Sequence, residues 1–118
     1  MDRRALGQKG EKLAQDYLKS KGYRIVEANY RCSIGEIDII AENKNRFAFV
    51  EVRTRSSREY GTPEESITEA KKEKLASLCM EYINNHKVSR EWHLDLIAVE
   101  VNAEGKLKRI DHLPDVLA

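Results

Sequence analysis

Hydrophobic positions recur at helical spacing in two stretches of the chain. The first stretch covers residues 3–21 and ends at Gly22, which favours termination of a helix. Its apolar stripe consists of Leu6, Leu13, Ala14, Tyr17 and Leu18. The second stretch begins at Thr62, with Pro63 at the first helical position and Glu65 placed to complete a capping box. The spacing predicts a second helix from Thr62 to about Asn85, with an inward stripe of Ile67, Leu75, Leu78, Cys79 and Tyr82.

Five other stretches have the composition and alternation of β-strands. They cover residues 23–31, 36–42, 46–55, 92–101 and 107–113. The turn-rich segment 42–46 predicts a hairpin between the second and third strands. The first three strands should form a meander, and the second helix should cross over to the fourth strand. The pattern therefore predicts one domain over residues 1–118, an α/β fold with helices flanking a mixed five-stranded sheet.

Two acidic residues interrupt the apolar pattern of the hairpin. A loop of two or four residues would place Asp38 opposite Glu51 and Glu36 opposite Arg53, whereas a three-residue loop would shift the pairing by one. Directly opposed residues have Cβ atoms about 4.5–5.5 Å apart. Two carboxylates at that separation repel each other, and each costs several kcal/mol to bury without compensation. A bound cation would explain their placement.

Three further charged residues leave two interpretations open. Glu11 lies about 20° from Leu18 on the helical wheel, so it either meets the sheet acids or flanks the stripe in solvent. Lys71 falls within the stripe of the second helix, where it either projects toward the sheet or extends outward into water. Asp95 opens an apolar run, and the favoured interpretation is an acid bonded to the backbone or to a basic side chain.

Composition limits the partners of the chain. The 21 basic residues are balanced by 20 acidic ones, so only local clustering could favour nucleic acid. Candidate phosphate contacts are Arg31, Arg53, Arg55 and Arg58. The two cysteines and three histidines have no metal-ligand spacing, which argues against zinc and predicts reduced thiols in a cytoplasmic protein. No apolar run approaches the length of a membrane span, so we expect no membrane association.

The acids suit a Mg²⁺ (or Mn²⁺) site that hydrolyses phosphodiesters. Mg²⁺ takes hard oxygen ligands, which Asp38, Glu51 and the main-chain carbonyl of Val52 could provide. Arg53 lies two residues beyond Glu51 on the same strand face, where it could contact the phosphate or the attacking water. It cannot act as a general base, because guanidinium does not deprotonate in proteins.

An acid on a hairpin followed by an acid-x-basic pair resembles the PD-(D/E)XK nuclease motif. The wider series comprises Gly7-x-x-Gly10-Glu11-x-x-Ala14-x-x-Tyr17-Leu18, Gly22-Tyr23, Asn29-Tyr30-Arg31, Gly35-Glu36-Ile37-Asp38-Ile39-Ile40, Phe49-Val50-Glu51-Val52-Arg53-Thr54-Arg55, Gly61, Lys71 and Asp95. This series resembles the YraN-like family of small bacterial predicted endonucleases, relatives of archaeal Holliday-junction resolvases. The resemblance covers residues 7 to about 99.

The resemblance implies a restriction-endonuclease-like fold and cleavage of DNA, including branched or damaged DNA. Glu11 would be the acid of the first helix that approaches the metal, and Asp38 and Glu51 would bind it. Glu36, Arg55 and Lys71 would be supporting members of the site. Related junction-cutting enzymes work as dimers because two strands must be cut, so the resemblance also implies a homodimer.

Arg53 departs from the motif, which has lysine at this position. Arginine can stabilise charge but differs from lysine in bulk and shape. Lys71 could supply the missing ammonium, so the candidate catalytic residues are Asp38, Glu51, Arg53 and Lys71. The main alternative is a nucleic-acid-binding module of the same fold that lacks catalysis. A third interpretation is a structural domain whose acids pair with the neighbouring arginines.

Overall fold

The structure, a computed structural model, describes residues 1–117 and has two helices and five strands in that range. The elements in chain order are α1 (Arg3–Ser20), β1 (Arg24–Cys32), β2 (Gly35–Glu42), β3 (Phe47–Arg55), a 3₁₀ turn (Glu64–Ser66), α2 (Glu69–His86), β4 (Trp92–Val101) and β5 (Leu107–Leu113). The predicted α/β fold with a mixed five-stranded sheet is confirmed. This arrangement is compatible with a restriction-endonuclease-like fold.

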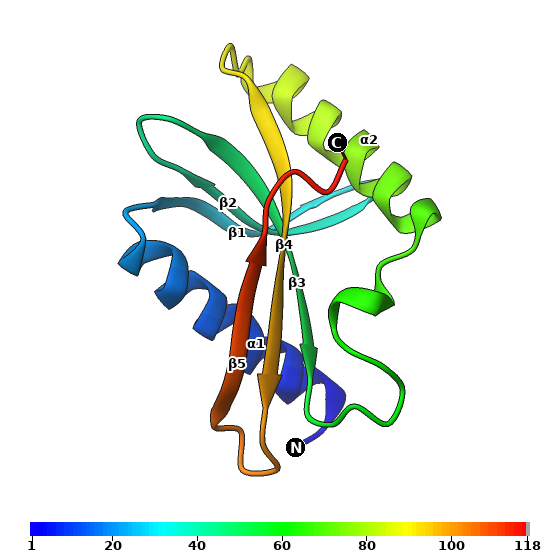
Figure 1. Ribbon diagram of the computed structural model, residues 1–118. Coiled ribbons are helices and arrows are strands. Elements are labelled where there is room, and N and C mark those ends of the chain that lie inside the picture. The colour runs from blue at the N-terminus through cyan, green and yellow to red at the C-terminus, as the bar shows by residue number, and fades with distance from the viewer. Residues whose placement is uncertain (118) are drawn as a thin grey trace.

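The strands lie in the sheet in their chain order, β1-β2-β3-β4-β5. The first three form an antiparallel meander, α2 crosses over so that β4 runs parallel to β3, and β5 returns antiparallel to β4. The predicted meander and crossover are thus confirmed. The sheet is strongly twisted, and the β1–β2 hairpin runs across the direction of β3 to β5 (Figure 1).

The two helices cover opposite faces of the sheet (Figure 1). On the α1 face, Ala14 and Leu18 pack against apolar side chains that include Val50 and Val52 of β3. On the α2 face, the buried side chains of the helix are joined by Phe47 and Phe49. Side-chain alternation along β3 therefore follows the prediction, because its valines and its acid-basic series belong to different faces.

The hairpin register is the one that a four-residue loop requires. Glu42 pairs with Phe47, so residues 43–46 form the loop, and the ladder continues to the Ile39–Val50 pair. The Asn43 side chain closes the loop by accepting hydrogen bonds from the backbone N–H groups of Asn45 and Arg46, both at 2.8 Å. Beyond Ile39 the paired ladder with β3 ends, while β2 stays paired with β1. This divergence opens the sheet where the acids lie.

The predicted start of the second helix was wrong by several residues. The Thr62 backbone N–H does donate to the Glu65 side chain, at 2.9 Å, but the turn that follows is a short 3₁₀ segment. The chain becomes extended at Ile67, and α2 begins only after Thr68, whose hydroxyl accepts from the Lys71 backbone N–H. Ile67 consequently packs against the α2-face core from outside the helix. Thr62 and Thr68 can both cap a helix, and α2 begins after Thr68, where Ile67 packs against the core.

Close packing of α1 on β3 is made possible by Gly10. A Cβ atom at this position would lie 1.8 Å from the Oγ1 atom of Thr54, so only glycine fits. The neighbouring Glu11 is thereby held against the open part of the sheet. Neither α1 nor α2, the two helices of residues 1–117, has the length and apolar character needed to cross a membrane.

Candidate metal centre

Three carboxylates from two elements meet where β2 leaves β3. Glu11 of α1 and Glu36 and Asp38 of β2 each have an oxygen within 4.8 Å of the others. The two β2 acids share a strand face because they are two residues apart, and Gly10 lets α1 bring Glu11 to them. Of the two interpretations of Glu11, the structure favours the one in which it meets the sheet acids.

Glu51 extends this cluster from β3. Continuation of the register beyond Ile39–Val50 puts it opposite Asp38, and its side chain is largely buried. The Val52 backbone N–H donates to Asp38 Oδ2 at 2.9 Å, so this residue contacts the acid through its amide. The use of the Val52 carbonyl as a metal ligand stays a prediction.

Burial and mutual repulsion change the acidity of the cluster. Burial, reinforced by the charges of Asp38 and Glu36, raises the pKa of Glu11 to about 7. Burial and the nearby Asp38 raise the pKa of Glu51 to about 8. Burial also raises the pKa of Asp38, against the lowering effect of the Val52 amide. Such a cluster retains protons at neutral pH unless a cation compensates the charge, and its hard oxygen donors fit Mg²⁺ or Mn²⁺.

Asn29 was not predicted as a member of this site from the sequence, and Glu36 was expected only as a supporting member. Asn29 has a φ of 54° on β1. With its amide nitrogen turned toward the acids, its side chain donates to Glu11 at 2.7 Å and to Glu36 at 3.0 Å. The only signal in the sequence was that both residues belong to the family-like series. The backbone conformation of Asn29 fits its residue type, because asparagine tolerates positive φ better than most residues. Asn29 therefore orients two carboxylates that are far apart in sequence.

Basic side chains border the acids on the α2 side. An Arg53 guanidinium nitrogen lies 2.7 Å from Glu51 Oε2, and its Nε is buried with no hydrogen-bond partner among residues 1–117. Arg53 and Lys71 line a hollow of about 200 Å³ together with Glu36 and Glu51. Lys71 is exposed, as expected for a lysine that extends outward, and it nevertheless borders the acids.

The four predicted phosphate-contacting arginines do not form one cluster. Arg31 binds Glu36 at 3.1 Å at the edge of the acid site. Arg53 and Arg55 both line a second, larger hollow, which Lys71 also borders. Arg58 instead donates two hydrogen bonds to Glu100, at 2.7 and 2.9 Å. Of the other three, Arg31 and Arg53 pair with acids of the site, and Arg55 lines the larger hollow.

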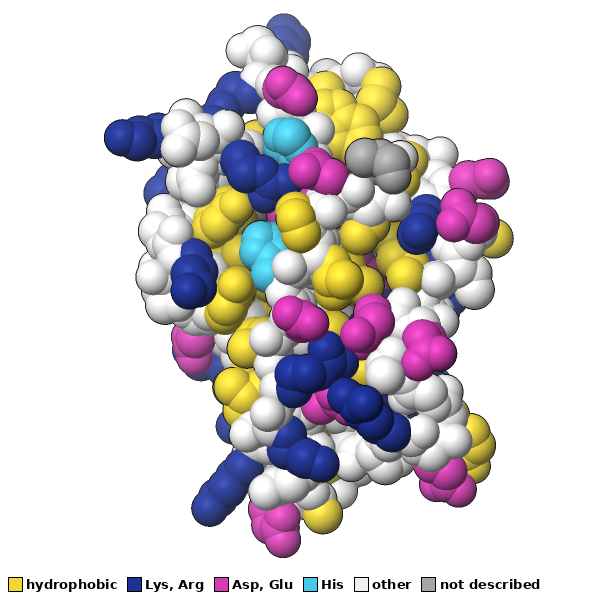
Figure 2. Space-filling model, viewed as in Figure 1, with side chains coloured by type: hydrophobic (Ala, Val, Ile, Leu, Met, Phe, Trp, Pro, Cys, Tyr) yellow, Lys and Arg dark blue, Asp and Glu magenta, His cyan; other side chains and the backbone are white. Residues whose placement is uncertain are grey.

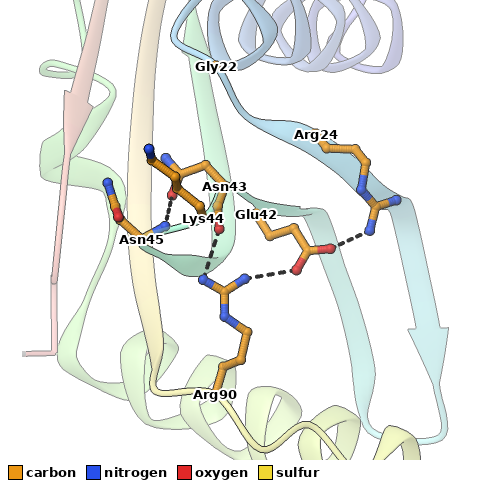
Figure 3. Close-up of a pocket in the computed structure, with 7 residues that line it drawn as sticks. All are labelled: Gly22, Arg24, Glu42, Asn43, Lys44, Asn45 and Arg90. Atoms are coloured by element: carbon orange, nitrogen blue, oxygen red, sulfur yellow. Dashed lines mark hydrogen bonds and ion pairs between the residues drawn. The ribbon is translucent and has the colours of Figure 1, made fainter.

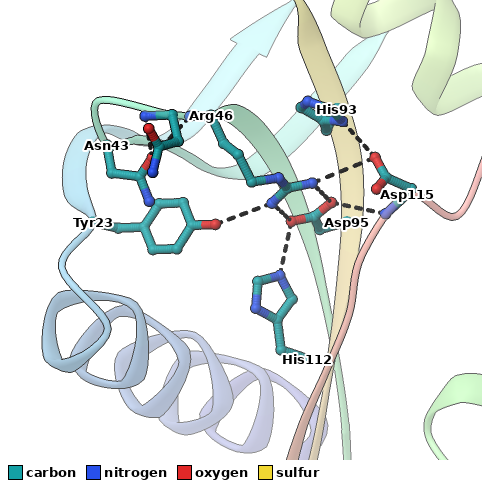
Figure 4. Close-up of polar contacts among 8 residues, drawn as sticks. Tyr23, Asn43, Arg46, His93, Asp95, His112 and Asp115 are labelled. Carbon is teal, nitrogen blue, oxygen red and sulfur yellow. Dashed lines mark hydrogen bonds and ion pairs between the residues drawn. The ribbon is translucent and has the colours of Figure 1, made fainter.

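Asp95, the other acid of the family-like series, belongs to a separate network (Figure 4). Its fully buried carboxylate accepts from Arg46 at 2.7 and 3.0 Å and from the Asp115 backbone N–H at 3.0 Å. His112 Nε2 lies 2.7 Å away. Burial alone would raise the pKa of Asp95, but these hydrogen bonds hold it well below its usual range. The expectation of an anchored strand-end acid is confirmed.

A hollow of about 680 Å³ at the β2–β3 loop contains no comparable group of acids (Figure 3). Its two arginines, Arg24 and Arg90, both bind Glu42, and Arg90 also donates to the Asn43 carbonyl at 2.8 Å. These contacts fasten the loop to the segment before β4. Both arginines of this hollow are therefore already paired.

Sequence comparison places the chain among bacterial proteins of similar length. A model of the family described as "Uncharacterised protein family UPF0102" matches residues 10–104. A UPF0102 protein of Desulforamulus reducens is 41% identical over 99% of this chain and 98% of its own length. Relatives from Caldanaerobacter subterraneus and Desulfitobacterium hafniense are 38% and 44% identical, covering 96% and 88% of this chain and 94% and 88% of their own lengths. The chain therefore belongs to the UPF0102 family, which confirms the YraN-like membership expected from its residues.

Proposed function

We propose that this protein is a divalent-metal-dependent endonuclease that hydrolyses phosphodiester bonds in DNA. The observation that supports this proposal best is the meeting of Glu11, Glu36 and Asp38 from a helix and a strand. Structural acids are usually paired with cations, whereas Glu11 and Asp38 lie among other carboxylates, and burial raises the pKa of both. Their oxygen-only donor set suits Mg²⁺ or Mn²⁺.

Each side chain has a role that follows from its position. Glu11, Asp38 and Glu51 would hold the metal, with Glu36 and Asn29 orienting Glu11. When bound, the metal supplies a Lewis acid for a phosphate oxygen and lowers the pKa of a coordinated water. The Arg53 guanidinium, beside Glu51, would contact the scissile phosphate and stabilise its developing charge.

Lys71 borders the same hollow and would add the ammonium that the motif usually carries on β3. Arg31 and Arg55 would contact neighbouring phosphates of the strand. The same proposal includes three further points: the DNA substrate is branched or damaged, two copies of the chain act together, and the protein is cytoplasmic.

One observation favours a nucleic-acid-binding module without catalysis. Arg53 occupies the lysine position and already pairs with Glu51 at 2.7 Å, which ties up a carboxylate that the metal would need. Such a module would bind the DNA backbone through Arg31, Arg55 and Lys71 with a strong dependence on salt.

Cleavage assays distinguish the two functions. Duplex, single-stranded and four-way-junction DNA would be incubated with Mg²⁺, with Mn²⁺ and with chelator. We expect cleavage only with metal, and a loss of about a hundredfold or more in Asp38→Asn and Glu51→Gln, with Glu104→Gln in an exposed turn as the matched control. Salt-sensitive binding with no cleavage of any substrate would establish the binding module instead. Cleavage that persists in Lys71→Ala but disappears in Arg53→Ala would remove Lys71 from the mechanism.

A further inference from the structure

A groove of about 800 Å³ adjoins the acid site. It is lined by the start of α1, the end of β3 and the segment between β3 and α2, with Arg3, Arg53, Arg55, Tyr60, Ser66 and Lys71 among its residues. Arg53 and Lys71 line both this groove and the hollow of the acids. The two depressions therefore adjoin each other at Arg53 and Lys71.

Three of the basic side chains in the groove are free to bind an anion. Within residues 1–117, neither Arg3 nor Arg55 nor Lys71 forms an ion pair, although many other arginines of the protein do. Serine hydroxyls and cationic groups along one groove match the requirements of a phosphodiester backbone. Unpaired cations at a concave surface also attract a polyanion from a distance.

Tyr60 gives the groove an aromatic platform. The side chain is 81% exposed, and it is the one aromatic among the large exposed apolar residues of the described chain. Tyr60 lies in a turn that is closed by the Gly61 N–H, which donates to the Arg58 carbonyl at 3.1 Å, and the Arg58 guanidinium anchors this turn to Glu100. A ring presented on an anchored loop beside free cations is the combination that binds unpaired bases in single-stranded nucleic acids.

We propose that this groove binds a single-stranded segment of DNA, with one base stacked on Tyr60 and adjacent phosphates on Arg3, Arg55 and Lys71. Bases of an intact duplex are already stacked on both faces, so an exposed ring gains contact only where a base is unpaired or terminal. The preferred substrate of the acid site is then DNA with a single-stranded region beside the cut. The choice of DNA rests on the proposed function, whereas the stacked base and the backbone contacts rest on the groove itself.

Metal-free binding measurements test the groove separately from cleavage. A fluorescently labelled oligothymidylate and a blunt duplex would be titrated in chelator with the parent protein, Tyr60→Ala and Tyr60→Phe. We expect tighter binding of the single strand, and a loss of roughly tenfold in Tyr60→Ala because stacking on one aromatic ring contributes that much. Tyr60→Phe keeps the ring and should retain the parent affinity. Leu107→Ala, also exposed but on β5 outside the groove, is the control.

A base analogue reports the stacking directly. A strand carrying 2-aminopurine should lose fluorescence on binding to the parent protein and to Tyr60→Phe, but not to Tyr60→Ala. Equal weakening of duplex and single strand in Tyr60→Ala, or quenching that does not depend on the ring, would overturn the proposal. Tighter, Tyr60-dependent binding of an RNA strand would overturn the assignment to DNA.

The outcomes separate this inference from the proposed function. If single-strand binding depends on the Tyr60 ring but no substrate is cleaved with Mg²⁺ or Mn²⁺, the nuclease activity is refuted and single-strand binding in the groove stands. If the protein cleaves DNA with metal but its affinity for single strands does not depend on Tyr60, single-strand binding in the groove is refuted and the nuclease activity stands.

Discussion

The acids of this protein that lie away from solvent fall into two groups, which differ in the partners that surround them. Asp95 is surrounded by Arg46, His112 and a backbone amide, and its pKa lies well below the usual range. Glu11 and Glu51 lie among other carboxylates, and their pKa values rise to about 7 and about 8. Burial raises the pKa in both regions, so the difference comes from the partners that each acid finds.

The comparison separates acids that cations hold in place from acids whose charge is only partly compensated. Glu100 is also held by cations: it binds Arg58 and Arg109, and these contacts lower its pKa to about 2. Figure 2 shows how closely basic and acidic side chains are interspersed over the lower part of one face. The carboxylate cluster contains four acids, Glu11, Glu36, Asp38 and Glu51. Only two guanidinium groups pair with them, that of Arg31 at Glu36 and that of Arg53 at Glu51. Their charge is under-compensated within the described chain, as a cation site requires.

Matched Asp→Asn substitutions in the two regions should have the largest and most different effects. Asp95→Asn removes the charge that holds Arg46 and His112, so the free energy of unfolding should fall by about 3 kcal/mol. Asp38→Asn keeps an oxygen for the Val52 N–H and removes a repelled charge, so metal-free stability should change by less than about 1 kcal/mol. Urea denaturation monitored by circular dichroism measures both changes. Equal losses would mean that the Asp38 cluster also serves the fold.

Divalent metal should stabilise one region alone. At a metal concentration of about 100 Kd, binding to the native state adds about 2.7 kcal/mol. Mn²⁺ should therefore raise the Tm of the parent protein and of Asp95→Asn by similar amounts, but not that of Asp38→Asn or Glu51→Gln. Calorimetry with a chelator reversal checks the effect. No gain at millimolar metal in the parent protein would rule out the proposed centre.

Acids paired with cations and acids of the carboxylate cluster should make stability depend on pH in opposite directions. Each proton contributes no more than about 1.4 kcal/mol per pH unit. Glu100 has a lowered pKa, so its contribution is present above the ordinary value of 4.5 and is lost as pH falls toward 2. Glu11 and Glu51 keep protons in the native state, so metal-free stability should fall as pH rises from 4.5 to about 8.

Denaturation in chelator across this range measures both limbs of the profile. Glu100→Gln should flatten the acid limb, and Glu51→Gln should flatten the limb above pH 4.5. If the parent protein shows no decline above pH 4.5, its carboxylates are not under-compensated.

Local patterns were sufficient to predict much of this arrangement. Loop length limited the hairpin to registers that include the observed one, in which Asp38 faces Glu51, and alternation separated Val52 from Arg53. Contacts between distant segments could not be obtained in this way. The Asn29 bridge from Glu11 to Glu36 depends on a positive φ and on how α1 crosses the sheet.

Competition between equally good local signals explains the other errors. Thr62 and Thr68 are both acceptable capping residues, and only the packing of Ile67 against the core decides between them. Arg58 looked equivalent to its neighbours in sequence, yet it alone of the predicted phosphate-contacting arginines reaches Glu100. Sequence therefore predicted the acids more completely than their partners.

Gly10→Ala tests whether close packing of α1 positions Glu11, and its effect on stability should be smaller than that of Asp95→Asn. The new Cβ would meet Thr54, and such overpacking typically costs about 1–3 kcal/mol, offset by about 1 kcal/mol of helix propensity. Gly7→Ala on the same helix meets no atom within 4 Å, so it should stabilise the protein. Denaturation measures this difference, and Mn²⁺ titration should show weaker binding for Gly10→Ala alone. Parent-like metal affinity in Gly10→Ala would show that the position of Glu11 does not depend on this contact. The Asp95 network should be unaffected in both glycine variants.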